Sequence, residues 1–183
     1  MTKGSFPLES FQSLETPFYY YDGNLLRRTL ETVRTELSEY EGFVMHYAVK
    51  ANANPSVLRM IAHAGLGADC VSGGEIRAAL DAGFPAKGIV YAGVGKKDWE
   101  IRLGLEKNIL CFNVESIAEL EVINEIAAGM DKVADVCLRI NPDVRAHTHK
   151  NITTGLAENK FGIALCDMLP AIEEAQAMKN VNF

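Results

Sequence analysis

The sequence places one lysine, Lys50, where the apolar run GFVMHYAV at 42–49 gives way to a polar stretch. A lysine at the end of a strand is usually structural, because its stem covers apolar surface while its ammonium group reaches water. The alternative is a Schiff-base lysine, since partial burial favours the neutral amine, which is the form that attacks a carbonyl carbon. The position of Lys50 alone leaves both interpretations open.

Other polar residues lie on or near the ends of apolar runs. Asp69 and Arg139 come late in two later runs, where a turn carboxylate and an ion-paired arginine are the ordinary interpretations. Ala48 and His46 share a strand face with Lys50, because side chains alternate along a strand. We interpret His46 as an inner-core histidine rather than a catalytic group.

Three further patterns could do chemistry, and we assign none of them to a site. His147 and His149 form an HxH pair, but no Asp, Glu or Cys stands at a supporting spacing, so no metal site is predicted. The glycines of AGVGKK at 92–97 could approach a phosphate, yet such glycines are common between a strand and a helix, and we interpret the stretch as a turn. Lys160 is a rival amine for which we expect a solvated or gating role.

A repeat of apolar runs indicates the elements that would position these side chains. The runs span 42–49, 65–71, 88–94, 108–114 and 133–140. Their starts lie 20 to 25 residues apart, which suits one strand plus one crossover helix. Ser72 with Glu75, and Ser116 with Glu119, have the capping-box spacing of helix starts. The sequence therefore predicts an α/β array of parallel strands.

Such an array can stay open or close into a barrel, and its period does not distinguish the two. The alternation within 42–50 favours a barrel. One set of side chains is apolar, as needed beneath covering helices, and comprises Phe43, Met45, Tyr47 and Val49. The other set is mixed, as is typical of an inner barrel face, and comprises Val44, His46, Ala48 and Lys50. A further short run at 180–183 predicts the start of a sixth strand, short of the eight that close a barrel.

Composition excludes several classes of partner. A net charge of -6 and an isoelectric point near 5.3 leave no basic field for nucleic acid or an anionic membrane. No signal peptide or membrane-spanning run is visible, so we expect a cytoplasmic protein with a small-molecule partner. The cysteines are far apart, and we expect buried thiols without disulfides; they are Cys70, Cys111, Cys137 and Cys166.

Four motifs in order carry a family resemblance. They are YAVKAN at 47–52, GADCVSGGEI at 67–76, LRINPD at 138–143 and TTGLAENKFGI at 153–163. Together they resemble the alanine-racemase-type, fold type III decarboxylases that depend on pyridoxal 5'-phosphate. The resemblance implies a (β/α)8 TIM-type barrel, present here as its first five or so βα units, with a C-terminal β domain missing. We therefore expect a 1–23 segment leading into an incomplete barrel domain at 24–183, within a chain about twice as long.

The resemblance also implies roles for individual residues. Lys50 would be the catalytic lysine that carries the cofactor as a Schiff base. Asp69 would lie beside the cofactor, where a carboxylate favours the protonated imine. Arg139 would lie near the cofactor ring, and Ala48 would need to stay small so as not to crowd that ring. No metal is expected.

The expected reaction is decarboxylation of an amino acid. The stretches TPFYYYD at 16–22 and HTHKNITTG at 147–155 favour family members that convert meso-diaminopimelate to L-lysine and CO2. Ornithine, arginine and carboxynorspermidine remain alternative substrates, and a non-catalytic barrel that only binds pyridoxal phosphate is a further alternative. The resemblance implies a homodimer for the full-length enzyme, while the 183-residue piece by itself is expected to be inactive.

Overall fold

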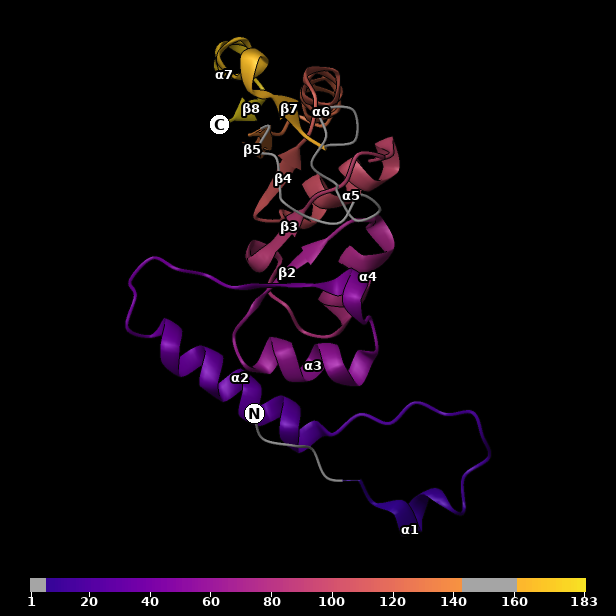
Figure 1. The fold of residues 1–183 in the computed structure, drawn as a ribbon. Coiled ribbons are helices and arrows are strands. Elements are labelled where there is room, and N and C mark those ends of the chain that lie inside the picture. The colour runs from indigo at the N-terminus through magenta and orange to yellow at the C-terminus, as the bar shows by residue number, and fades with distance from the viewer. Residues whose placement is uncertain (1–5, 143–160) are drawn as a thin grey trace, which may run out of the picture.

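Six parallel strands form the centre of the molecule (Figure 1). The computed structural model describes residues 6–142 and 161–183. The strands pair in chain order and are β1 (His46–Ala48), β2 (Gly67–Cys70), β3 (Ile89–Tyr91), β4 (Cys111–Val114), β5 (Ala134–Leu138) and β8 (Val181–Asn182). The predicted α/β array is confirmed, and β8 is the sixth strand expected at 180–183.

Helices alternate with these strands. The α-helices are α1 (Leu8–Phe11), α2 (Gly23–Leu37), α3 (Pro55–His63), α4 (Gly73–Asp81), α5 (Asp98–Lys107), α6 (Ile117–Gly129) and α7 (Met168–Ala177). Helices α3 to α6 lie along one side of the sheet (Figure 1). Short 3-10 turns are η1 (Val49–Ala51), η2 (Ala86–Gly88) and η4 (Leu165–Asp167). A separate pair, β6 (Ile140–Asn141) and β7 (Ile163–Ala164), was not predicted.

Both predicted capping pairs start helices, with one difference in detail. The Ser72 hydroxyl accepts a hydrogen bond from Glu75 N at 3.2 Å, as a capping serine should. The Glu75 carboxylate, however, accepts from Val71 N at 2.8 Å, one residue before the cap. Ser116 and Glu119 repeat this arrangement, with Glu119 accepting from Glu115 N at 2.9 Å. Each pair therefore also ties down the end of the strand that precedes its helix.

Helices cover one face of the sheet, and the other face is partly exposed and carries polar side chains. Beneath the helices, strand residues exposed by 2% or less form the core; they are Ala68, Cys70, Ile89, Tyr91, Phe112 and Val114. On the other face, Ala48 lies beside Asp69, which lies beside Val90, and all three are half-buried. His46 lies on that face against Gly67, where any β-carbon would collide with the imidazole ring. The expectation that His46 lies on the inner face is confirmed.

The predicted first strand is too long at its start. The strand begins at His46, and Phe43 and Met45 are 70% and 41% exposed, so placing them beneath helices was wrong. Tyr47 is half-buried and Val49 is fully buried, as predicted. The reason is that β2 begins at Gly67, directly after the turn at Gly65 with φ +84°, and so offers no backbone to pair with Phe43.

Two of the cysteine predictions also need correction. All four thiols are free, but Cys137 and Cys166 are exposed, whereas Cys70 and Cys111 are buried. Cys137 lies on the polar face of the sheet, opposite Asn113 in the register of β4 with β5, and the described helices α3 to α6 lie on the other side (Figure 1). Among the helices that the structure describes, none is both long and apolar enough to cross a membrane.

Candidate functional site

A cavity of about 910 Å³ lies at the carboxyl ends of the parallel strands. Its lining includes Lys50 after β1, Asp69 on β2, Gly93 after β3, Glu115 after β4 and Arg139 after β5. The carboxyl ends of parallel strands are where barrel enzymes of this architecture place their active sites. The strand order thus brings Lys50 and Arg139 to one cavity, although they are 89 positions apart in the chain.

Lys50 lies in η1, immediately after β1 ends at Ala48. The turn is held by a hydrogen bond of 3.1 Å from the Tyr47 hydroxyl to the carbonyl of Asn52. The Asn52 side chain in turn accepts from Asn54 N at 2.9 Å. Burial raises the pKa of Tyr47, so the hydroxyl keeps its proton and remains a donor. The turn therefore presents the Lys50 side chain at the cavity from a fixed backbone.

Asp69 faces the same cavity from the neighbouring strand. It pairs with Ala48 in the sheet, two residues before Lys50. One of its carboxylate oxygens, Oδ1, is buried and has no hydrogen-bond partner in the described part of the chain. A buried acceptor without a partner costs free energy, so this oxygen is a point where a ligand donor would be stabilising.

Arg139 also lines this cavity. It stands between β5 and β6, and its Nη1 atom donates to Glu115 Oε1 at 3.0 Å. Its guanidinium lies 5.6 Å from the centre of the Phe161 ring, which lines the same cavity. The side chain is 47% exposed. It can therefore still donate hydrogen bonds to a ligand while Glu115 holds one of its nitrogens.

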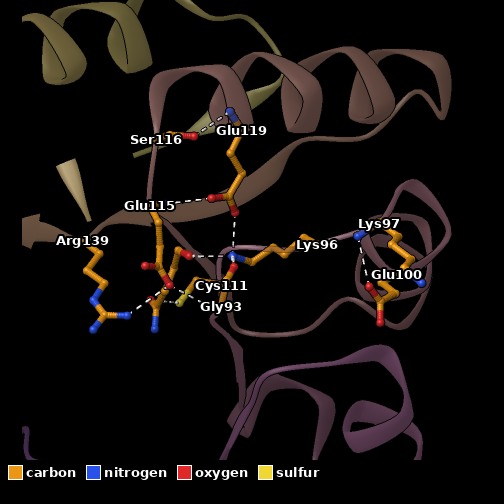
Figure 2. A network of polar contacts seen from close by, with 10 residues as sticks. Gly93, Lys96, Lys97, Glu100, Cys111, Glu115, Ser116, Glu119 and Arg139 are labelled. Atoms are coloured by element: carbon orange, nitrogen blue, oxygen red, sulfur yellow. Dashed lines mark hydrogen bonds and ion pairs between the residues drawn. The ribbon is translucent and has the colours of Figure 1, made fainter. Parts of the chain in front are cut away.

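A buried ion pair supports the loop after β3 (Figure 2). The Lys96 side chain is 1% exposed, and its ammonium donates to the carbonyl oxygens of Gly93 and Asn113, each at 2.8 Å. Its third partner is the Glu119 carboxylate. The ammonium also lies 5.2 Å from the centre of the Tyr91 ring. AGVGKK is a turn, as predicted, and its first lysine fastens that turn to β4 and α6.

A second buried carboxylate joins α4 to α5. Glu100 is 6% exposed and accepts hydrogen bonds from Gly73 N at 2.7 Å and from Lys97 N at 3.0 Å. Burial by itself would raise the pKa of Glu100. The two N–H groups and the Tyr91 hydroxyl outweigh burial and hold the pKa of Glu100 below its usual value. Glu100 therefore stabilises the fold in its ionised form.

Replacing Glu100 with glutamine should lower the free energy of unfolding by about 2 kcal/mol at neutral pH, because the charge-assisted bonds are lost. Because the pKa of Glu100 is lower in the folded protein than in the unfolded chain, where it is near 4.5, its ionised form stabilises the fold above that pH. This contribution to stability disappears as the pH falls through the pKa of the folded state. In urea unfolding, the difference in the free energy of unfolding between variant and wild type should thus shrink below about pH 4.5. Glu106→Gln, an exposed neighbour on α5, is the control. A difference that is the same at every pH would contradict this account.

The structure brings three of the predicted site residues, Lys50, Asp69 and Arg139, into one cavity. Ala48 is half-buried beside Asp69 but does not itself line that cavity. Other predictions fall on 143–160, outside the described residues: His147 and His149, taken as a loop without metal, and Lys160 as a solvated or gating amine.

Sequence reasoning missed the carboxylates around the cavity. Glu115 was visible only as one acidic residue in the stretch NVESIAEL at 113–120, where Glu119 was identified only as a capping residue. Their use depends on partners more than 20 residues away, such as Arg139, 24 positions from Glu115. No local signal marks Glu115 or Lys96, because each stands among other polar residues, in NVES at 113–116 and in KKD at 96–98.

Comparison with known proteins identifies the family of the chain. The family described as pyridoxal-dependent decarboxylase, pyridoxal binding domain, matches residues 24–183. Diaminopimelate decarboxylase of Bacteroides thetaiotaomicron is 65% identical over 181 residues, which are 99% of this chain and 47% of that protein. The corresponding enzyme of Aquifex aeolicus is 41% identical, over 94% of this chain and 40% of its own.

Solved structures show the same fold. Diaminopimelate decarboxylase from Helicobacter pylori, complexed with L-lysine, has a TM-score of 0.86 and 42% identity, covering 96% of this chain and 44% of its own. The chain thus spans less than half the length of the relatives it matches. The lysine, the carboxylate and the arginine of the cavity stand on the domain that the family match covers, and the chain belongs to the pyridoxal-dependent decarboxylase family through its pyridoxal-binding domain.

Proposed function

We propose that this chain forms the cofactor-binding part of an enzyme that decarboxylates meso-diaminopimelate to L-lysine and CO2. The observation that carries the proposal is the amine of Lys50 at a cavity beside an unpartnered carboxylate oxygen of Asp69. The identity of 65% to a diaminopimelate decarboxylase supports this substrate over ornithine, arginine or carboxynorspermidine. The complex of a relative with L-lysine, the expected product, supports it as well.

The residues present fit pyridoxal phosphate. Lys50 would bond covalently to the aldehyde carbon, and the buried Asp69 oxygen would accept a hydrogen bond from an N–H group formed there. Arg139 would offer its free N–H groups to an acceptor of the cofactor or substrate. When bound, the cofactor supplies an electron sink for the bond that breaks. The chain's own contribution is to hold the amine, place one negative and one positive group beside it, and seal the far side of the sheet with helices.

An assay of CO2 release by the full-length protein tests this proposal. Meso-diaminopimelate, ornithine, arginine and carboxynorspermidine are compared at equal concentration with pyridoxal phosphate present. Meso-diaminopimelate should be turned over at least about 10²-fold faster than the others, because a site built to bind its distal carboxylate rejects substrates that lack that group. Preference for another of the four would reassign the substrate. Cofactor binding without release of CO2 from any of them would indicate a non-catalytic carrier.

The same proposal includes the organisation of the chain. We propose residues 1–23 as a segment leading into a pyridoxal-binding barrel domain at 24–183. The start of α2 at Gly23 and the family match from residue 24 support this division. We also propose that the full-length enzyme is a cytoplasmic homodimer, as the family resemblance implies. Light scattering of the purified full-length protein would measure its mass, and a monomer would contradict the dimer.

Enlarging Ala48 should block the cofactor. Ala48 lies beside Asp69 in the sheet and two residues before Lys50, so a leucine there would project from the strand face that carries Asp69, a residue of the cavity lining. Ala48→Leu should weaken the affinity for pyridoxal phosphate by about 10-fold or more, as expected for overpacking of a fitted site. Ala48→Ser, which adds a single atom, is the matched control. Absorbance titration measures both, and wild-type affinity in the leucine variant would refute the expected crowding.

A further inference from the structure

Glu115 joins the ends of three strands at the cavity (Figure 2). Its carboxylate oxygen Oε1 accepts from the backbone N–H of Gly93, after β3, at 3.0 Å. The same oxygen accepts from Arg139 Nη1, after β5, at 3.0 Å. The Glu115 side chain is only 3% exposed, although it lines the cavity.

The position of Glu115 does not depend on Arg139. Its own backbone N–H donates to Glu119, and the Glu119 carboxylate is paired with the buried Lys96. The Lys96 ammonium also donates to the carbonyl of Gly93, so Lys96 and Glu119 together hold the backbone at Gly93 and at Glu115. Glu115 is therefore a fixed anchor, whereas Arg139 is a long side chain with 47% of its surface exposed.

A purely structural role leaves the charge of Glu115 unexplained. The N–H of Gly93 needs one acceptor, and the amide oxygen of a glutamine would serve equally. A buried carboxylate costs free energy unless a cation balances it, and Arg139 is the cation that contacts Glu115 among the described residues. The second oxygen, Oε2, is buried and has no partner within the residues described. The negative charge of Glu115 is thus explained by its ion pair with Arg139 at the cavity.

We propose that Glu115 is a positioning residue, which holds the guanidinium of Arg139 at the cavity so that its remaining N–H groups face the bound cofactor or substrate. This inference rests on the proposed function. Without the negative charge, the arginine would lose a charge-assisted bond and would turn toward solvent, because long side chains gain rotamer entropy there. Glu115 acts through Arg139, and its effect should vanish when Arg139 is absent.

A double-mutant cycle on the full-length protein tests this dependence. The dissociation constant of pyridoxal phosphate is measured by absorbance for wild type, Glu115→Gln, Arg139→Met and the double variant. Glu115→Gln keeps an acceptor for Gly93 and should weaken binding by about 10-fold, the value of one charge-assisted bond. The double variant should bind no more weakly than Arg139→Met alone, because coupled residues are not additive.

The matched control is Glu121→Gln, which removes one exposed negative charge from α6 and should leave the affinity unchanged. Should Glu115→Gln fail to fold, Glu115→Asp offers the same comparison, since it keeps the charge but withdraws the carboxylate from Gly93 N and Arg139 by one methylene. Binding by these Glu115 variants that is as tight as in the wild type, or effects that add in the double variant, would overturn the proposal.

The same titrations separate this inference from the function on which it rests. If the wild-type protein fails to form the lysine-linked cofactor at all, the proposed function is wrong. If the wild type forms it and the Glu115 variants do so with equal affinity, only the positioning role of Glu115 is wrong.

Discussion

Replacing Lys50 with alanine should abolish the absorbance of lysine-linked pyridoxal phosphate in the full-length protein. It should also reduce the rate of CO2 release at least about 10³-fold, because losing a covalent nucleophile costs an enzyme this much or more. The physical reason is that Lys50 is the lysine whose side chain lines the cavity at the carboxyl ends of the strands, in the described part of the chain. Absorbance spectra and a CO2 assay give the two measurements.

Two variants make the Lys50 result specific. Lys50→Arg keeps the positive charge but has no amine that can bond to the aldehyde, so it should fail as alanine does. Lys97→Ala removes an exposed lysine that does not line the cavity and should bind the cofactor like the wild type. Retention of the lysine-linked absorbance in Lys50→Ala would reject the assignment, and Lys160→Ala would then test the rival amine.

Replacing Lys96 with methionine should lower the free energy of unfolding by about 3 kcal/mol. The change leaves the Glu119 carboxylate without its cation and the carbonyls of Gly93 and Asn113 without their donor. Removing one partner of a buried ion pair is strongly destabilising, while the 13% exposure of Glu119 limits the effect to the lower part of the usual range. Urea unfolding followed by circular dichroism measures the change.

The neighbouring residue supplies the control for Lys96. Lys97→Met alters an exposed lysine side chain and should change the free energy of unfolding by less than about 0.5 kcal/mol. The double variant Lys96→Met with Glu119→Leu should recover part of the loss, because it leaves no unpaired charge in the core. Equal stability of Lys96→Met and Lys97→Met would show that the buried pair contributes nothing.

The order of elements was determined by the sequence alone. Apolar runs at 20 to 25 residue intervals predict parallel strands, because a strand and a helix that covers it need about that length. The same pattern put Lys50 and Asp69 at strand ends, and parallel strands bring such ends to one edge of a sheet. Local signals such as Ser72 with Glu75 were reliable because their bonds join residues within one turn.

Only the tertiary structure decided which polar groups meet. The bonds from Glu115 to Gly93 and to Arg139 cross 22 and 24 residues of chain, and register between strands sets them rather than any local spacing. The burial of Phe43 was overestimated for the same reason, since β1 extends only as far back as β2 offers backbone to pair. Sequence thus determines what each element is and which residues end it, whereas packing between elements determines which charges are buried together and so which side chains can be held at the cavity.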